Sequence, residues 1–201
     1  MSEYWRCAFV GEGSSDDGLV PVLEQLLVSL RPGDYFDLEP YRWVRPPRDR
    51  SVAAKIRALT AEPYELIFVH RDADSAGMKS RVDECLACQD KRVVPVVPVR
   101  MTEAWVLADL WSDAEFRAWA SREGFRLAQV EGLTDPKRVL ENYLNRERSS
   151  HMSPSEFACQ RSALIRRISI EGDVTTLDAW RELTEQVTAS FVRVKNYLAY
   201  T

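Results

Sequence analysis

This 201-residue chain has few of the residues that bind soft metals, with only two histidines and four cysteines. His70 and His151 lie far apart in the sequence, so a histidine-rich zinc site is not expected. Cys85 and Cys88 form one Cys-x-x-Cys pair, but a zinc ribbon needs two such pairs and no second pair follows. We interpret the pair as two small side chains three residues apart on one helix.

Long apolar runs are also lacking. No stretch approaches the roughly 20 residues of a membrane-spanning helix. The first six residues lack the apolar core of a secretory signal. We therefore expect a cytoplasmic protein without membrane contact, in which the cysteines are reduced.

The sequence contains no P-loop, no Gly-x-Gly-x-x-Gly motif and no serine nucleophile elbow. ATP hydrolysis by this chain itself is therefore not expected, and an ATPase would have to be a partner. The net charge of -4 excludes a globally basic nucleic-acid binder. A few well-placed arginines would still be enough for a local basic patch.

Predicted strands and helices alternate through about residue 110. The strands are expected at residues 4–10, 36–44, 65–70 and 92–99, and the helices between them at 17–30, 51–60 and 75–88. This alternation predicts an α/β fold with a mostly parallel sheet covered by helices on both faces. Pro95 and Pro98 indicate that the last strand is irregular or lies at an edge of the sheet.

The rest of the chain is predicted to be mainly helical. Helices are expected at residues 113–122 and 180–198. Two more are expected between them, one that begins with Asp135 as its N-cap and one that begins with a capping box at Ser153. We expect residues 1–110 to form the α/β core and residues 111–201 to form a helical C-terminal part packed on it, as one compact domain.

The last predicted helix carries an aromatic stripe of Trp180, Phe191 and Tyr197. Such a stripe either packs on the sheet or contributes to a homodimer interface, and packing is the commoner use.

Acidic residues follow three of the predicted strands. Glu12 lies between two glycines after the first strand, Asp72 and Asp74 follow the third, and Glu103 follows the fourth. In open α/β sheets, ligands bind outside the carboxyl ends of the strands. Carboxylates gathered there repel one another, and Mg²⁺ favours a few carboxylate oxygens together with substrate phosphate. We therefore predict a Mg²⁺ or Mn²⁺ site, which Asp16, four residues after Glu12, could also face.

Asp72 and Asp74 point to the same side if the strand geometry persists through them, roughly 6–7 Å apart along the strand. The alternative is a polar turn in which Asp74 or Ser75 caps the next helix. His70 shares this face of the strand and could bind the metal or relay a proton, or it could be a packed strand end.

The other acids also have purely local explanations. Asp16 and Asp17 suit the beginning of a helix, and Thr102 could be an N-cap with Glu103 in the first turn. Arg100, close by in the sequence, could neutralise a carboxylate or hold a phosphate.

Residues 41–50 form a locally positive segment. It holds four arginines and two aromatic residues: Tyr41, Arg42, Trp43, Arg45, Arg48 and Arg50. Guanidinium groups suit phosphates and aromatic rings stack on bases, so the segment is a predicted nucleic-acid contact. The alternative is an exposed loop with Trp43 packed in the core.

Glu12 after the first strand and Asp72-x-Asp74 after a later one resemble the Toprim arrangement of topoisomerases, primases and overcoming-lysogenization-defect nucleases. Four motifs narrow the resemblance, and they occur in order at residues 9–16, 70–74, 95–105 and 135–137. Together they resemble an uncharacterised bacterial Toprim-like family that is often encoded beside ATPases in anti-phage or mobile-element loci. The resemblance covers residues 4–145.

By position, this resemblance implies that Glu12 assists proton transfer and that Asp72 and Asp74 hold Mg²⁺. Asp16 matches the family's acidic position four residues after the glutamate.

Arg100 and Glu103 match the Arg-x-x-Glu motif of the same family. Lys137 follows the Asp-Pro of the last motif and could stabilise the charge of a phosphorane, as a lysine does in related nucleases. Its alternative is a surface lysine in the first turn of a helix.

Together, these features favour a divalent-metal-dependent nucleic-acid phosphodiesterase, with DNA ahead of RNA as substrate and an ATPase partner, in bacterial defence or a mobile element. The first alternative is a non-catalytic Toprim-like adaptor or sensor that binds an ATPase or nucleic acid. The second is a nucleotide-sugar or phosphotransfer site with Asp72 as nucleophile, but such a site needs no Glu12.

Overall fold

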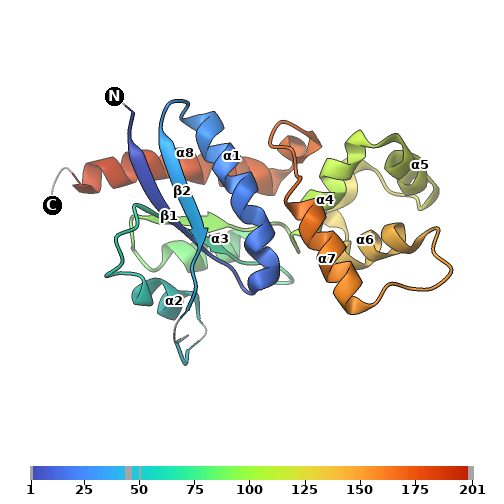
Figure 1. The fold of residues 1–201 in the computed structure, drawn as a ribbon, viewed down its shortest axis with the longest axis horizontal. Helices are drawn as coiled ribbons and strands as arrows, with labels where there is room; N and C mark the ends of the chain where they lie inside the picture. The colour runs from blue at the N-terminus through green and yellow to red at the C-terminus, as the bar shows by residue number, and fades with distance from the viewer. Residues whose placement is uncertain (1, 44–46, 50, 199–201) are drawn as a thin grey trace.

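The computed structural model describes residues 2–43, 47–49 and 51–198. At its centre lies a four-stranded sheet in the order β2-β1-β3-β4, in which every neighbouring pair is parallel (Figure 1). The strands are β1 (Tyr4–Val10), β2 (Tyr35–Pro40), β3 (Leu66–His70) and β4 (Val93–Val96). The predicted α/β fold is confirmed, and β4, which contains Pro95, lies at an edge as its prolines indicated.

Helices cover both faces of the sheet. Successive side chains of β1 point to opposite faces, so neighbouring residues of this strand pack in different core clusters. Cys7 and Phe9 belong to a core cluster with residues of α1 (Val20–Leu30) and α8 (Asp178–Leu198). Ala8 and Val10 belong to a second cluster with residues of α2 (Val52–Ala58) and α3 (Met78–Leu86). Cys85 of α3 is buried in this second cluster, and Cys88 packs against it from the turn after α3, so the two cysteines do not lie on one helix as predicted.

The other helices form a lobe beside the sheet (Figure 1). They are α4 (Glu103–Asp109), α5 (Ala114–Arg122), α6 (Pro136–Asn145) and α7 (Pro154–Ile165). Trp105 of α4 is fully buried and packs edge-on against Trp180 of α8, with 5.2 Å between the ring centroids. One buried core cluster therefore joins the lobe to the α1 face of the sheet.

Helix α8 runs from the lobe along the sheet until Lys195 meets Glu3 near the N-terminus, with 2.9 Å between Nζ and Oε1 (Figure 1). Trp180 and Phe191 of this helix are buried against the core, which favours the packing interpretation of the aromatic stripe. The Tyr197 side chain lies outside the part of the chain that the structure describes.

Several element boundaries differ from the prediction, among them those of β2 and α3. β2 ends at Pro40 rather than at residue 44, after which the Tyr41 N–H still donates to the Phe9 carbonyl (2.8 Å). α3 begins at Met78 rather than at residue 75, because Asp74 and Gly77 have φ angles of 46° and 83°, which a right-handed helix does not accommodate. Neither Asp74 nor the following serine is the N-cap, since Gly77 holds that position.

Helix α1 begins later than predicted because residues Ser14–Leu19 form a 3₁₀ helix before it. The predicted caps are confirmed: Asp135 accepts from the Arg138 N–H (2.9 Å), and Ser153 and Glu156 form a capping box. Within the described residues, no helix is long and apolar enough to cross a membrane.

Candidate functional site

The carboxyl ends of β1, β3 and β4 meet beside the helical lobe, as the order of the strands requires. Glu12, Asp16, Asp72, Glu103 and Lys137 all line one cavity of about 510 Å³ at this place. We call it the carboxylate cavity. Lys137 comes from α6 in the lobe, so tertiary packing brings the last sequence motif to the first three.

Asp16 is held in place by the backbone turn that contains Glu12. Its Oδ2 accepts the N–H groups of Glu12 (3.0 Å) and Gly13 (3.1 Å). A Cβ on Gly11 would lie 3.1 Å from the Asp16 Cβ and 3.2 Å from its Oδ2, closer than an ordinary contact. Gly11 is therefore the residue that allows the Asp16 side chain to fold back under β1.

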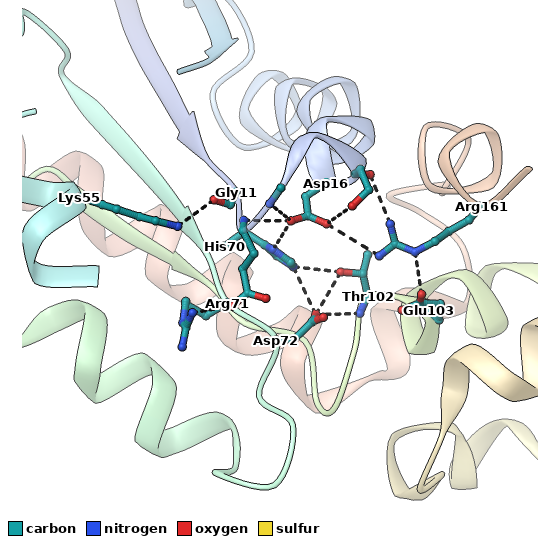
Figure 2. A network of polar contacts seen from close by, with 12 residues as sticks. Gly11, Asp16, Lys55, His70, Arg71, Asp72, Thr102, Glu103 and Arg161 are labelled. Atoms are coloured by element: carbon teal, nitrogen blue, oxygen red, sulfur yellow. Dashed lines mark hydrogen bonds and ion pairs between the residues drawn. The ribbon is translucent and has the colours of Figure 1, made fainter. Parts of the chain in front are cut away.

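A buried histidine joins the first and second acidic motifs (Figure 2). His70 Nδ1 lies 3.3 Å from Asp16 Oδ2, close enough for an ion pair but not aligned as a hydrogen bond. Its Nε2 lies 2.9 Å from Thr102 Oγ1 and 3.5 Å from Asp72 Oδ1. The Thr102 N–H donates to the same Asp72 oxygen (3.1 Å). His70 at the end of β3 and Thr102 at the N-cap of α4 thus fix the Asp72 carboxylate.

Arg161 of α7 is the site residue that the sequence did not indicate. Its Nε donates to Glu103 Oε1 (2.6 Å) and its Nη1 to the Ser15 carbonyl (3.3 Å), while Nη2 lies 3.8 Å from Asp16 Oδ1 (Figure 2). An arginine within a helix gives no sequence signal that distinguishes this role from a solvated surface position. The guanidinium group neutralises two of the carboxylates predicted to bind metal.

The close approach of α7 depends on another glycine. A Cβ on Gly18 would lie 3.1 Å from Ile165 Cγ2 and 3.2 Å from the Ser162 carbonyl. Its absence lets the 3₁₀ helix pack against α7 and brings Arg161 to the end of the sheet.

The two central aspartates differ in charge environment. Burial is the largest influence on Asp72 and, together with the nearby charges of Glu103, Glu12 and Asp16, it raises the pKa to about 6 against the opposing effect of His70. Burial also acts to raise the pKa of Asp16, but the contact with His70, the backbone and Arg161 outweigh it and hold the pKa at about 2. Among the described residues, Asp72 forms no ion pair with a lysine or arginine.

Glu12 is paired with Arg71, which lies in the second acidic motif. The Arg71 Nη1 donates to Glu12 Oε1 (2.6 Å), and 37% of the Glu12 side chain is exposed. Among the carboxylates of the cavity that pair with an arginine, Glu12 is therefore the most exposed.

Asp74 and Arg100 lie apart from the carboxylate cavity. The Arg100 Nη1 donates to the Asp74 carbonyl (3.3 Å), and the Asp74 N–H donates to the Arg100 carbonyl (3.0 Å). The extended geometry that would keep Asp72 and Asp74 together does not persist, since β3 ends at His70 and Asp74 has a positive φ.

The donor set of the cavity can be compared with the chemistry of a divalent cation. Within the described residues, no group of three or more His, Cys, Asp or Glu side chains is arranged to hold a metal ion. The oxygen donors of Asp72 and Glu12 nevertheless fit Mg²⁺, which commonly uses one or two carboxylates plus waters and substrate phosphates. The negative charges around Asp72 also favour a cation at this place.

The arginine-rich segment is only partly described. Arg42 pairs with Asp17 (2.7 Å) and Arg48 is exposed, whereas Arg45 and Arg50 lie outside the described residues. Trp43 packs against Tyr41 and the α2 side of the core, in line with the alternative interpretation. Tyr41, Arg42 and Trp43 also line a second cavity of about 240 Å³.

No protein-family model matches this chain, and no match was found among curated proteins or solved structures. The Toprim-like resemblance therefore rests on the four sequence motifs and remains a prediction.

Proposed function

We propose that the protein is a Mg²⁺- or Mn²⁺-dependent phosphodiesterase that acts on nucleic acid. One observation carries the proposal: carboxylates from the ends of three neighbouring parallel strands and a lysine from the lobe line a single cavity. This is the edge of an α/β sheet at which ligands bind. Carboxylates with an adjacent cationic side chain suit a phosphate diester and its metal ion.

Asp72 and Glu12 are the proposed metal ligands. Asp72 is fixed by Thr102 and His70 and, among the described residues, is paired with no lysine or arginine. Glu12 is exposed enough to leave Arg71 or to share its carboxylate with a cation. The bound cation would polarise the scissile phosphate and activate a water molecule.

Arg161 takes a supporting role in this proposal. It neutralises Asp16 and Glu103, which then position the turn after β1 and the beginning of α4. With these two carboxylates neutralised, Asp72 and Glu12 remain as the proposed ligands of one divalent cation.

Lys137 is the proposed electrostatic stabiliser of the phosphate. It is exposed at the cavity, and its Nζ lies 6.0 Å from the centroid of the Phe157 ring. Its positive charge can bind a phosphate and stabilise charge that develops in the transition state. Asp74 and Arg100 lie outside the cavity wall, and the proposal gives them no direct role.

DNA as the substrate, an ATPase partner and a place in bacterial defence are part of the proposal, and these follow from the sequence resemblance alone. A cytoplasmic location is also proposed, because the sequence has no long apolar run.

Titration of Mn²⁺ by calorimetry, with and without an oligonucleotide, tests the metal site. We expect the wild type to bind and Asp72→Asn to bind at least tenfold more weakly. Asp74→Asn is the matched control and should bind like the wild type, because Asp74 is exposed outside the cavity. A folded wild type that binds no Mn²⁺ under either condition would contradict the proposal.

Cleavage assays on single-stranded DNA, duplex DNA and RNA test the reaction. We expect Glu12→Gln to abolish cleavage while the thermal unfolding temperature stays near that of the wild type. Full cleavage by this variant would show that Glu12 has no role in the reaction.

A second candidate function is a non-catalytic adaptor that binds an ATPase or nucleic acid. It is favoured by the ion pairs of Glu12 with Arg71 and of Glu103 with Arg161, which satisfy much of the cluster without a metal. Nucleic-acid binding without Mn²⁺ affinity would support this candidate.

A further inference from the structure

The second cavity lies directly beside the carboxylate cavity. Glu12 and Gly13 line both of them. A group bound in the second cavity would therefore be next to a proposed metal ligand. We refer to this second cavity, lined by Tyr41, Arg42, Trp43 and Lys55, as the aromatic pocket.

We propose that the aromatic pocket binds one unstacked nucleobase of a single-stranded nucleic acid and so places the adjoining phosphate at Glu12. This inference rests on the proposed function for the identity of the ligand as a nucleic acid. It adds the strandedness of the substrate and the residues that select it.

The rings that form the aromatic wall of the pocket pack against one another and against the core. The Tyr41 and Trp43 rings contact each other edge-to-face, with 4.8 Å between their centroids. Tyr41 also packs against Tyr64 at 6.2 Å, and its N–H donates to the Phe9 carbonyl of β1 (2.8 Å). A ring that is already fixed loses little conformational freedom when a base stacks on it, and such stacking contributes about 1–3 kcal/mol per base.

Two cationic side chains border the same pocket. The Lys55 Nζ donates to the Gly11 carbonyl (3.2 Å), which places an ammonium group beside the turn that carries Glu12. Arg42 pairs with Asp17, but 68% of its side chain is exposed. The Asp17 side chain of this pair is only 16% exposed, so we expect Arg42 to keep this contact and to use its remaining N–H groups for a phosphate.

The size of the pocket selects against a duplex. Its volume of about 240 Å³ is below the roughly 300–1,000 Å³ of pockets for drug-sized ligands. It can take one base but not a base pair with its neighbours stacked. A base reaches it only from a single strand or after it has left a duplex, and extrusion from a duplex costs a few kcal/mol.

Fluorescence anisotropy with labelled oligothymidylate in EDTA tests the pocket without any metal or cleavage. We expect tighter binding of the single strand than of the same strand in a duplex. Trp43→Leu should weaken single-strand binding about tenfold, and Trp43→Phe should retain most of it because a stacking face remains. Arg42→Gln should weaken binding severalfold, whereas Arg122→Gln, an exposed arginine of α5, should not.

Equal binding of single strand and duplex, or wild-type affinity in both Trp43→Leu and Arg42→Gln, would overturn the inference. EDTA removes divalent cations, so this binding does not depend on the metal and a failure of the metal proposal leaves the result unchanged. Thermal unfolding of each variant shows whether it is folded. If Trp43→Leu does not fold, Arg42→Gln and Trp43→Phe still test the pocket.

Discussion

Replacing Asp72 with asparagine is expected to make the folded protein more stable at neutral pH. The Asp72 side chain is only 18% exposed and lies near the carboxylates of Glu12, Asp16 and Glu103. Asparagine has nearly the same shape, and its Oδ1 can still accept the Thr102 N–H (3.1 Å). The substitution therefore removes a repelled charge and keeps the main contact.

The size of the effect follows from the pKa of Asp72, which rises from 3.8 to about 6 on folding. Each pKa unit corresponds to about 1.4 kcal/mol, so ionisation at neutral pH costs the folded state on the order of 3 kcal/mol. Because the folded pKa is the higher one, the stabilising contribution of protonated Asp72 is fully present below pH 3.8 and is lost as the pH rises through 6. The variant should match the wild type near pH 4 and exceed it above pH 7.

Thermal unfolding in EDTA between pH 4 and pH 8 measures this difference. For a chain of this size, about 3 kcal/mol corresponds to a rise of roughly 6–12 °C in the unfolding temperature. Asp74→Asn serves as the control, since Asp74 is exposed and lies outside the carboxylate cavity. If Asp72→Asn is less stable than the wild type at pH 7.5, or if its gain is equal at pH 4, the electrostatic reasoning is refuted.

Three further predictions concern the same cluster. Adding Mg²⁺ should raise the unfolding temperature of the wild type but not that of Asp72→Asn, because a ligand stabilises only the state that binds it. Arg161→Met should lower the free energy of unfolding by about 3–5 kcal/mol in urea denaturation, because it leaves buried carboxylates unpaired. Arg166 is exposed, so Arg166→Met is the control, and an equal loss of stability in both variants would contradict this role of Arg161. Gly11→Ala should lower the free energy of unfolding by about 1–3 kcal/mol, because the added Cβ would crowd Asp16. Gly13→Ala should lower it much less, since a Cβ there has no contact closer than 4.0 Å. A larger loss of stability in Gly13→Ala than in Gly11→Ala would contradict the argument.

Much of the fold could be predicted from local patterns. The apolar runs that become β1 and β3 and the apolar spacing in α1 determine the α/β alternation, because strand and helix periods differ. Consecutive strands of such a chain run parallel, so the residues after them meet at one edge of the sheet. The sequence therefore predicts that Glu12, Asp72 and Glu103 lie near one another, and all three line the carboxylate cavity.

The divergence of Asp72 and Asp74 was not predictable in the same way. Two residues with strand spacing point together only while the backbone stays extended. The positive φ of Asp74, opposite a positive φ at Arg100, ends that geometry. A paired turn of this kind depends on the contact between two loops and has no local signature.

The sequence by itself determined the order of strands and helices, the parallel sheet, and the acids that stand at its carboxyl end, because all of these follow from periodicity and from residue type within a few positions. Only the tertiary structure decided how those acids are neutralised. Glu103 and Arg161 are 58 residues apart in the chain, and they meet because Gly18 lets α7 pack closely against the turn after β1. Ion pairs formed across such distances depend on packing and leave no pattern in the sequence.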